Sequence, residues 1–431
     1  MTVASSLEPL LRSIFGTAEP PVRVRFWDGS DLGGEIGRSD DAVLVLRSPD
    51  ALRRLLYAPG ELGFGRAYVA GDIDVEGDIY AILDLRRLLG EVRDHVEVRL
   101  DRHGIVALLK AGRSLRLIGR PLPPPLEEAH LRGALHSKVR DAAAIAHHYN
   151  VGNDFYRAVL GPTMAYSCGY WPNAQTTLDD AQTAKIELIC RKLALRPGMR
   201  LLDIGCGWGA MAMHAAQHYG AHVVGVTVAR EQAELARKRI AEAGLADRIE
   251  IRLQDYRDVD DGPFAAISSI GMSEHVGRDR LGDYLGVVMR LLQPEGRFLN
   301  HAISSPDTRG GKVPPRSFIG RYVFPDGELI EVGSLITAMQ DLGLEVRDVE
   351  SLREHYARTL RAWVANLEAR WDELVGIVGV GRARVWRLYM AASALNFEMN
   401  RTAIHQVLAV RPSKDGNSAM PATRLPFASV D

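Results

Sequence analysis

The chain has 431 residues, enough for two or three domains that each bury a core. Hydrophobic residues make up 46% and charged residues 25%, which is typical of folded soluble proteins and excludes disordered or collagen-like chains. The 53 Lys and Arg nearly balance the 54 Asp and Glu, so no nucleic-acid partner is expected. Three cysteines are too few for a disulfide framework or a cysteine zinc site, and no apolar run could span a bilayer. We therefore expect a cytoplasmic protein without a metal, whose membrane contact is peripheral.

The first part of the chain predicts a small α+β domain over residues 1–125. Residues 22–27 and 42–46 are short β-branched or alternating runs, and residues 79–89 have a helical pattern. The proline-rich segment PLPPP at 121–125 cannot continue a helix and predicts a semi-rigid linker.

A basic amphipathic stretch precedes that linker. Residues 102–120 contain five Lys or Arg and no Asp or Glu, interleaved with leucine, isoleucine and valine. Such a segment can lie on an anionic lipid surface, with its apolar face at the headgroup boundary. It can equally be a surface helix packed on its own domain, and composition alone favours that simpler interpretation.

From residue 126 to 431 the pattern predicts a second domain of alternating strands and helices. At this spacing the strands form a mainly parallel sheet with helices on both faces. The predicted strands are 199–204, 222–228, 249–253, 265–270 and 297–302, and the predicted helices are 184–195, a segment around His214, 231–243 and 284–292.

The segment LLDIGCGWG at 201–209 leaves the first of these strands, passes three alternate glycines and enters a helix. Glycines allow a tight turn and close approach of a ligand, and the helix N-terminus attracts negative charge. The pattern is not GxGxxG, and no Lys-Ser or Lys-Thr pair follows, so a dinucleotide site or a P-loop lacks its other parts.

Three loops in order identify the class. DIGCGWG follows the first strand, GVTVAREQ the second and LQDYRD the third, and this set resembles the S-adenosylmethionine-dependent methyltransferases. The resemblance implies an α/β, Rossmann-like class I methyltransferase domain beside the smaller N-terminal α+β domain.

Further blocks are similar to the cyclopropane fatty acid synthase family, which includes mycolic acid cyclopropane synthases and actinobacterial enzymes that form 10-methylene fatty acids. The similarity extends from about residue 60 to about residue 410. The blocks are LGFGRAYVAGD (62–72), HHYNVGNDFY (147–156), MAYSCGYW (164–171), QDYRDV (254–259), GMSEHVG (271–277) and RYVFPDGEL (321–329).

By this resemblance, nine residues would bind S-adenosylmethionine. Many methyltransferases hold the ribose hydroxyls with an acidic residue after the second strand, but this chain has Thr227 there, with Gln232 one turn later. The resemblance therefore implies a neutral ribose clamp. For Tyr256 alone, packing at the sheet edge is the simpler alternative. The nine residues are Tyr166, Ser167, Gly205, Gly207, Thr227, Gln232, Gln254, Asp255 and Tyr256.

The same family is thought to use a bound bicarbonate ion as the base that removes a proton after methyl transfer. Its binding positions match Cys168, Glu274, His301, Ile303 and Tyr356, and together these can grip a small planar anion by hydrogen bonds. Taken singly, each has a simpler explanation as a buried or helix-start residue.

An apolar stripe at helical spacing comes later in the chain. It could line a channel for an acyl chain, although ordinary core packing is the slightly better explanation. The stripe consists of Tyr356, Leu360, Trp363, Leu367 and Trp371.

Two departures from the family pattern bear on the product. Ser273 replaces a large aromatic residue, and Asn300 replaces an apolar residue before His301. They favour a methylene-branched chain made from an oleoyl phospholipid over a cyclopropane. The alternatives from other classes are a non-catalytic lipid-binding protein and a small-molecule methyltransferase.

Together with the basic stretch, the resemblance leads us to expect peripheral contact with anionic lipid at the inner face of the membrane. It leaves open a homo-oligomer and a separate reductase that acts on a methylene product.

Overall fold

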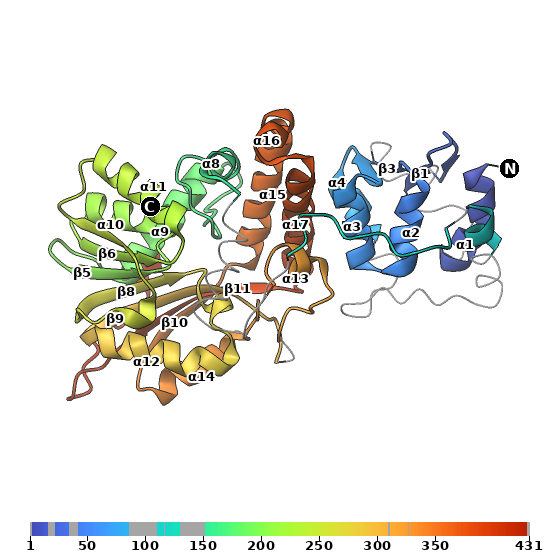
Figure 1. Ribbon diagram of the computed structural model, residues 1–431. Coiled ribbons are helices and arrows are strands. Elements are labelled where there is room, and N and C mark those ends of the chain that lie inside the picture. The colour runs from blue at the N-terminus through green and yellow to red at the C-terminus, as the bar shows by residue number, and fades with distance from the viewer. Residues whose placement is uncertain are drawn as a thin grey trace. The chain divides into compact units, whose positions relative to one another are not determined.

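The computed structural model describes residues 2–15, 22–33, 42–85, 110–115, 117–129, 151–308, 311–325 and 327–428. The chain divides into two compact units (Figure 1). Unit 1 combines Met1–Ala129 with two later segments, Pro315–Val323 and Trp371–Leu395. The rest of the chain forms unit 2, which comprises His130–Pro314, Phe324–Arg370 and Asn396–Asp431.

Unit 1 contains a four-stranded sheet in the order β2-β1-β3-β4, with β1 parallel to β3 and the other pairs antiparallel. The strands predicted at 22–27 and 42–46 correspond to β1 and β3, and the predicted helix at 79–89 begins as α4. The elements are α1 (Val3–Phe15), β1 (Arg23–Arg25), β2 (Asp31–Leu32), β3 (Val43–Leu46), α2 (Pro49–Tyr57), α3 (Glu61–Ala70), β4 (Ile73–Glu76), α4 (Ile79–Leu83), α13 (Phe318–Tyr322), α16 (Trp371–Val378) and most of α17 (Val380–Glu398).

The glycine-rich helix α3 packs tightly within unit 1. A Cβ on Gly65 would lie 2.3 Å from Cδ2 of Phe318, so only glycine lets α3 approach α13 this closely. Arg66 makes a bidentate ion pair with the buried Glu128 at 2.7 and 2.8 Å. The LGFGRAYVAGD block is therefore explained by packing.

Unit 2 is built on a seven-stranded sheet in the order β10-β11-β9-β8-β5-β6-β7, in which β11 runs antiparallel to both neighbours. This confirms the predicted Rossmann-like α/β class. The strands are β5 (Arg200–Ile204), β6 (His222–Thr227), β7 (Ile249–Leu253), β8 (Phe264–Ile270), β9 (Leu292–Ser304), β10 (Glu345–Ser351) and β11 (Ala403–Val410).

Helices cover both faces of this sheet. The helices are α8 (Asn153–Leu160), α9 (Leu178–Lys192), α10 (Ala210–Tyr219), α11 (Arg230–Glu242), α12 (Leu281–Leu291), α14 (Val332–Asp341), α15 (Arg353–Ala369) and α18 (Leu425–Ala428), with short 3₁₀ turns η1 (Tyr256–Asp258), η2 (Ser273–His275) and η3 (Arg278–Arg280).

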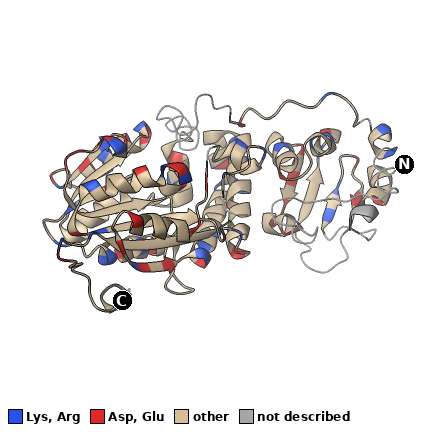
Figure 2. Cartoon of the chain, turned by 90° about the horizontal axis from the view of Figure 1, so that it is seen from below, with Lys and Arg blue, Asp and Glu red and all other residues tan. Residues whose placement is uncertain are grey.

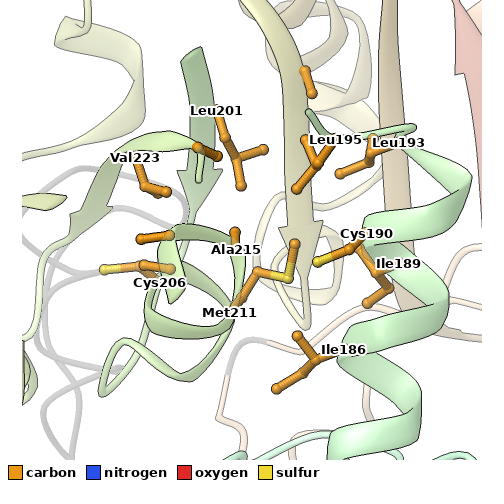
Figure 3. Packing of buried hydrophobic residues seen from close by; sticks show 14 of the residues in the cluster. Ile186, Ile189, Cys190, Leu193, Leu195, Leu201, Cys206, Met211, Ala215 and Val223 are labelled. Atoms are coloured by element: carbon orange, nitrogen blue, oxygen red, sulfur yellow. The ribbon is translucent and has the colours of Figure 1, made fainter. Parts of the chain in front are cut away.

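Two hydrophobic clusters hold the helices on the sheet. On one face, Ile189 and Cys190 of α9 and Ala215 of α10 pack against Leu201 and Val223 of the central strands (Figure 3). On the other face, α12 and α14 pack on β8, β9 and β11. These clusters fix where the carboxyl ends of the strands lie.

Helix α9 begins at Leu178, six residues before the predicted start. The Thr177 side chain caps the helix by accepting a hydrogen bond from the amide of Asp180, a signal that the apolar pattern alone does not contain.

None of the described helices is long and apolar enough to cross a membrane. Lys and Arg lie interspersed with Asp and Glu in the view of Figure 2.

Candidate active site

A cleft opens in unit 2 where the strand order reverses, between β5 and β8. In sheets of this kind ligands bind beyond the carboxyl ends of the strands at that point. The cleft has a volume of ≈ 130 Å³, and it is lined by the ends of β5, β6 and β8, by α9 and α10, and by residues 164–167.

The glycine loop forms the floor of the cleft. The amides of Gly205 and Cys206 both donate to the Val226 carbonyl at 3.0 Å, which ties the loop to β6. Gly205 and Gly207 have φ of +76° and +53°, a left-handed conformation that favours glycine. Helix α10 begins at Ala210, which also lines the cleft, so the positive end of the helix dipole lies beside the ligand space.

Eight of the nine residues predicted to bind S-adenosylmethionine line this cleft, and Asp255 does not. Thr227 donates to Gln232 across 3.1 Å, and both side chains are buried, so the end of β6 is neutral as expected. Asp255 instead caps η1 and pairs with Arg257. The eight are Tyr166, Ser167, Gly205, Gly207, Thr227, Gln232, Gln254 and Tyr256.

Two charged residues of the cleft have no counterpart among the predicted sites. Lys185 of α9 donates to the Ser167 hydroxyl at 2.9 Å, and burial lowers its pKa to about 8. Burial raises the pKa of Asp203 to about 6, although Ser268 donates to this carboxyl at 2.7 Å. Asp203 belongs to the glycine motif and could have been predicted, whereas Lys185 resembles any lysine on a helix surface.

Tyr166 and Trp208 line the cleft, and further aromatic rings pack against them. The ring of Tyr156 lies 4.8 Å from that of Trp208 and 5.8 Å from that of Tyr166, measured between centroids. Tyr166 also contacts Trp363 of α15 at 5.3 Å. The Trp208 indole donates to Asn153 of α8 at 2.8 Å, which fixes its orientation. Rings of this kind can bind an apolar or cationic group.

Glu274 and Ile303, two of the five predicted anion-site residues, are in direct contact. The Ile303 amide donates to Oε1 of Glu274 at 2.7 Å. Oε2 of Glu274 is buried and has no partner within the part of the chain that the structure describes. Burial raises the pKa of Glu274 to about 7. The side chain can therefore hold or release a proton near neutral pH.

His301 lies on β9, directly opposite Ile270, which lines the cleft. It is 1% exposed, and neither ring nitrogen has a partner among the described residues. Burial, together with the charges of Lys185 and Lys192, lowers the pKa of His301 well below its ordinary value. A neutral imidazole offers one donor and one acceptor.

Cys168 and Tyr356 meet at the start of α15. The Cys168 thiol points at the Leu352 carbonyl, 3.6 Å away, and the amide of Tyr356 donates to the same carbonyl at 3.0 Å. Burial raises the pKa of the Cys168 thiol, so its sulfur is unreactive and only its backbone is suited to binding. The Tyr356 ring packs 4.8 Å from that of Phe397.

A second, smaller cavity of ≈ 20 Å³ lies against Glu274, and polar groups from β9 and β11 line it. Ser273 and Asn300, the two departures from the family pattern, both face it. The Tyr284 hydroxyl donates to the side-chain Oδ1 of Asn300 at 3.2 Å. The cavity is large enough for about one water molecule.

The apolar stripe is divided between two helices. Tyr356, Leu360, Trp363 and Leu367 are buried on α15, which agrees with core packing. Trp371 belongs to α16 in unit 1, because α15 ends at Ala369, so including it in the stripe was wrong.

No group of three or more His, Cys, Asp or Glu side chains that could hold a metal ion occurs in the described ranges.

Comparison with known proteins gives consistent matches. The family profile described as mycolic acid cyclopropane synthetase matches residues 136–407. The chain is 42% identical to a probable fatty acid methyltransferase of Mycobacterium tuberculosis, over 96% of this chain and 97% of that protein. It is 36% identical to the cyclopropane-fatty-acyl-phospholipid synthase of Escherichia coli K12, over 90% of this chain and 92% of the relative.

Among solved structures, the fold is similar to a mycolic acid cyclopropane synthase complexed with SAH and CTAB. The TM-score is 0.58 at 33% identity, and the match covers 62% of this chain and 97% of that one.

Proposed function

This chain belongs to the mycolic acid cyclopropane synthetase family, and from that premise we propose that it transfers the methyl group of S-adenosylmethionine to a cis double bond of an unsaturated acyl chain, an oleoyl chain of a membrane phospholipid. The observation that carries the proposal is the cleft at the reversal of strand order, whose lining residue Ile270 lies opposite the buried, unpartnered His301 on the neighbouring strand. Glu274, which also has an unpartnered oxygen, directly precedes His275 of the lining. Relatives named as fatty acid methyltransferase and cyclopropane-fatty-acyl-phospholipid synthase support the substrate class.

The cleft fits S-adenosylmethionine by its shape and its lining. The bare glycine backbone and the start of α10 suit the methionine carboxylate, and the neutral Thr227–Gln232 pair suits the ribose hydroxyls. Tyr256 lies in the turn η1 that follows β7 and lines the cleft, and the face of its ring suits the adenine. When bound, the cofactor supplies a methyl group on a positively charged sulfur.

In the proposed reaction the alkene π electrons form a new carbon–carbon bond to that methyl group. The sulfur–methyl bond breaks, S-adenosylhomocysteine leaves, and the positive charge passes to the neighbouring chain carbon. The rings of Tyr166 and Trp208, which line the cleft, would exclude water from this cation and face it with π electrons.

The cation must lose a proton, and the unpartnered atoms of Glu274 and His301 fit a bicarbonate ion, which would supply the base. The ion would accept hydrogen bonds from the His301 ring and, by the family resemblance, from the Tyr356 hydroxyl and the Cys168 amide, and its own hydroxyl would donate to Oε2 of Glu274. The Ile303 amide already donates to Glu274, so Ile303 acts by orienting that carboxyl.

We propose a methylene-branched product. A hydride shift moves the charge onto the carbon that carries the new methyl, and loss of a proton from that methyl then leaves an exocyclic double bond. Direct loss from the methyl with ring closure gives the alternative, a cyclopropane. The polar Ser273 and Asn300 behind Glu274 support a wetter and less tightly shaped base site, in which the cation lives long enough to rearrange. A separate reductase would be needed to saturate the methylene group.

The deciding experiment is gas chromatography with mass spectrometry of phospholipids from a host that expresses the protein. A methylene-branched 19-carbon chain is expected, a cyclopropane would overturn the product assignment, and unchanged lipids would favour a non-catalytic lipid-binding protein or a small-molecule methyltransferase. Glu274→Gln and His301→Ala should each lower turnover about 100-fold or more while leaving cofactor affinity near that of the parent. Normal turnover in both would show that the base lies elsewhere.

A further inference from the structure

Gln406 is a buried amide that no part of the proposed reaction uses. It is 0% exposed, and both its Oε1 and its Nε2 lack a partner among the described residues. A buried amide left without hydrogen bonds costs about 1–3 kcal/mol, so such groups are rare unless a neighbour or a ligand satisfies them.

The register of the sheet places Gln406 directly beside His301. The two residues are opposite one another in the antiparallel pair β9–β11, so their side chains project from the same face at neighbouring positions. His301 is also buried, with both ring nitrogens unpartnered in the described part of the molecule. Four unpartnered polar atoms thus lie on two adjacent side chains, and no hydrogen bond joins them in the rotamers of this structure, so a side-chain rotation would be needed to pair them.

The residues that lie side by side across the sheet show on which side of His301 the cleft lies. On one side of His301 lies Ile270, which lines the cleft, and on the other side lies Gln406, followed by Glu350 of β10. Gln406 is therefore behind His301 as seen from the cleft. It is placed to act on His301 and not on the cofactor.

Beyond Gln406 the row ends in an ion cluster. Lys192 of α9 contacts Asp348 at 3.0 Å and Glu350 at 2.5 Å, and the lysine side chain is buried. A carboxylate directly beside His301 would favour the charged imidazolium, whereas a neutral amide separates the ring from this cluster and leaves it neutral.

We propose that Gln406 is a positioning residue that holds one ring nitrogen of His301 by a hydrogen bond, sets its tautomer, and so presents the other nitrogen to the reaction centre. The partner of one ring nitrogen determines which nitrogen of a histidine carries the proton, and for metal-ligating histidines the loss of that partner typically costs 10- to 100-fold in affinity or activity. The catalytic consequence rests on the proposed function, but the pairing itself does not.

The test is ¹⁵N NMR of histidine-labelled protein, with the His301 signals identified by their loss in His301→Ala. In the parent we expect one neutral tautomer. Gln406→Leu should give a mixture of tautomers and lower kcat about tenfold or more, with the KM for S-adenosylmethionine nearly unchanged. Gln406→Glu places a carboxylate beside the ring and should shift His301 toward the imidazolium, which the same spectra detect.

Leu408→Ala is the matched control. Leu408 is fully buried, lies two residues after Gln406 on β11, and projects from the same face of the sheet. It should lower the melting temperature without changing the His301 signals. A Gln406→Leu variant with unchanged tautomer would overturn the proposal, even if its activity fell. A changed tautomer in a protein that modifies no lipid would confirm the pairing and contradict the proposed function.

Discussion

Gly207 combines a left-handed backbone conformation with open space beside its α-carbon, as several other described glycines do. Its φ is +53°, and a Cβ built there meets nothing within 4 Å because it points into open space at the cleft. A side chain at this position would therefore not disturb the empty protein by collision. It would occupy the space that the ligand needs.

We expect Gly207→Val to abolish binding of S-adenosylmethionine, measured by calorimetry, while the protein stays folded. Gly244→Val is the matched control, since Gly244 has φ +68°, equally open space and a position at the end of α11 outside the cleft lining. Both variants carry the same backbone strain of about 1–2 kcal/mol. Equal cofactor affinity in the two variants would rule out the assignment of the glycine loop.

Glu274 predicts a pH dependence of stability. The pKa of Glu274 in the folded protein is about 7, above the ordinary 4.5. Its protonated form therefore contributes fully to the free energy of unfolding below about pH 4.5, and this contribution is lost as the pH rises to 7. Glu274→Gln stays neutral throughout and keeps the oxygen that accepts the Ile303 amide. We expect the variant to gain stability relative to the parent across this window, by about 3 kcal/mol at most.

Urea denaturation of ligand-free protein at several pH values measures this difference, in which the contributions of all other groups cancel. A difference that is constant from pH 5 to 8 would show that Glu274 is ionised in the folded protein and not held in a poorly solvated site.

At the scale of elements, the approach of α3 to α13 depends on one missing methyl group. We expect Gly65→Ala to destabilise unit 1 by about 1–3 kcal/mol, because its Cβ would lie 2.3 Å from the buried Phe318 ring. Phe318→Leu in the same chain should restore part of the loss. Cofactor affinity should not change, since the cleft belongs to unit 2.

Gly112→Ala serves as the control for this prediction. Gly112 is also a helical glycine of unit 1, but its added Cβ would lie at an ordinary 3.8 Å from Ile118. Thermal melting of both variants distinguishes collision from a general effect of alanine. Equal melting temperatures would contradict the packing explanation of the LGFGRAYVAGD block.

Element boundaries show where periodicity is insufficient. The stripe from Tyr356 to Trp371 keeps helical spacing, yet α15 ends at Ala369 and the next helix joins another unit. Helical spacing indicates which residues would share a face of one continuous helix. It does not indicate whether the helix is continuous. At α9, conversely, the cap at Thr177 was a local signal that marks the true start.

At the scale of the whole molecule, the described part of the basic stretch is compatible with both interpretations. Leu117 is buried and Arg53 of α2 donates to the Arg120 carbonyl at 2.8 Å, so the segment packs on its own unit. Ile118 is nevertheless 66% exposed, and Lys110 and Arg113 are exposed beside it in sequence. Residues 101–109 and 116 lie outside the described ranges.

If this segment binds lipid, replacing Lys110, Arg113 and Arg116 by Gln should weaken binding to anionic vesicles, at about 1 kcal/mol for each charge. Parent binding should fall with added salt and be weak on neutral vesicles. Vesicle flotation measures both effects. Activity on vesicle lipids should fall with binding, whereas cofactor affinity should not.

A variant with Arg157, Lys238 and Arg280 changed to Gln removes the same charge from exposed positions of unit 2. It should float like the parent. Equal loss in both triple variants would mean that net charge alone governs binding, and no loss in either would return the segment to a purely structural role.

Much of unit 2 could be predicted from sequence. The strand at 249–253 and the order of the three loops after β5, β6 and β7 depend on residues close together in the chain, and so does the glycine turn at 205–209. Local preferences and short-range hydrogen bonds determine such features before any distant contact forms.

Tertiary structure decided what no local pattern contains. It buried Lys185 beside Ser167 and set Gln406 opposite His301 across two strands more than 100 residues apart. It also placed Pro315–Val323 and Trp371–Leu395 in unit 1. Burial, and with it the pKa of a lysine or a glutamate, depends on which faces of distant elements meet, and that choice is made by the packing of the whole chain.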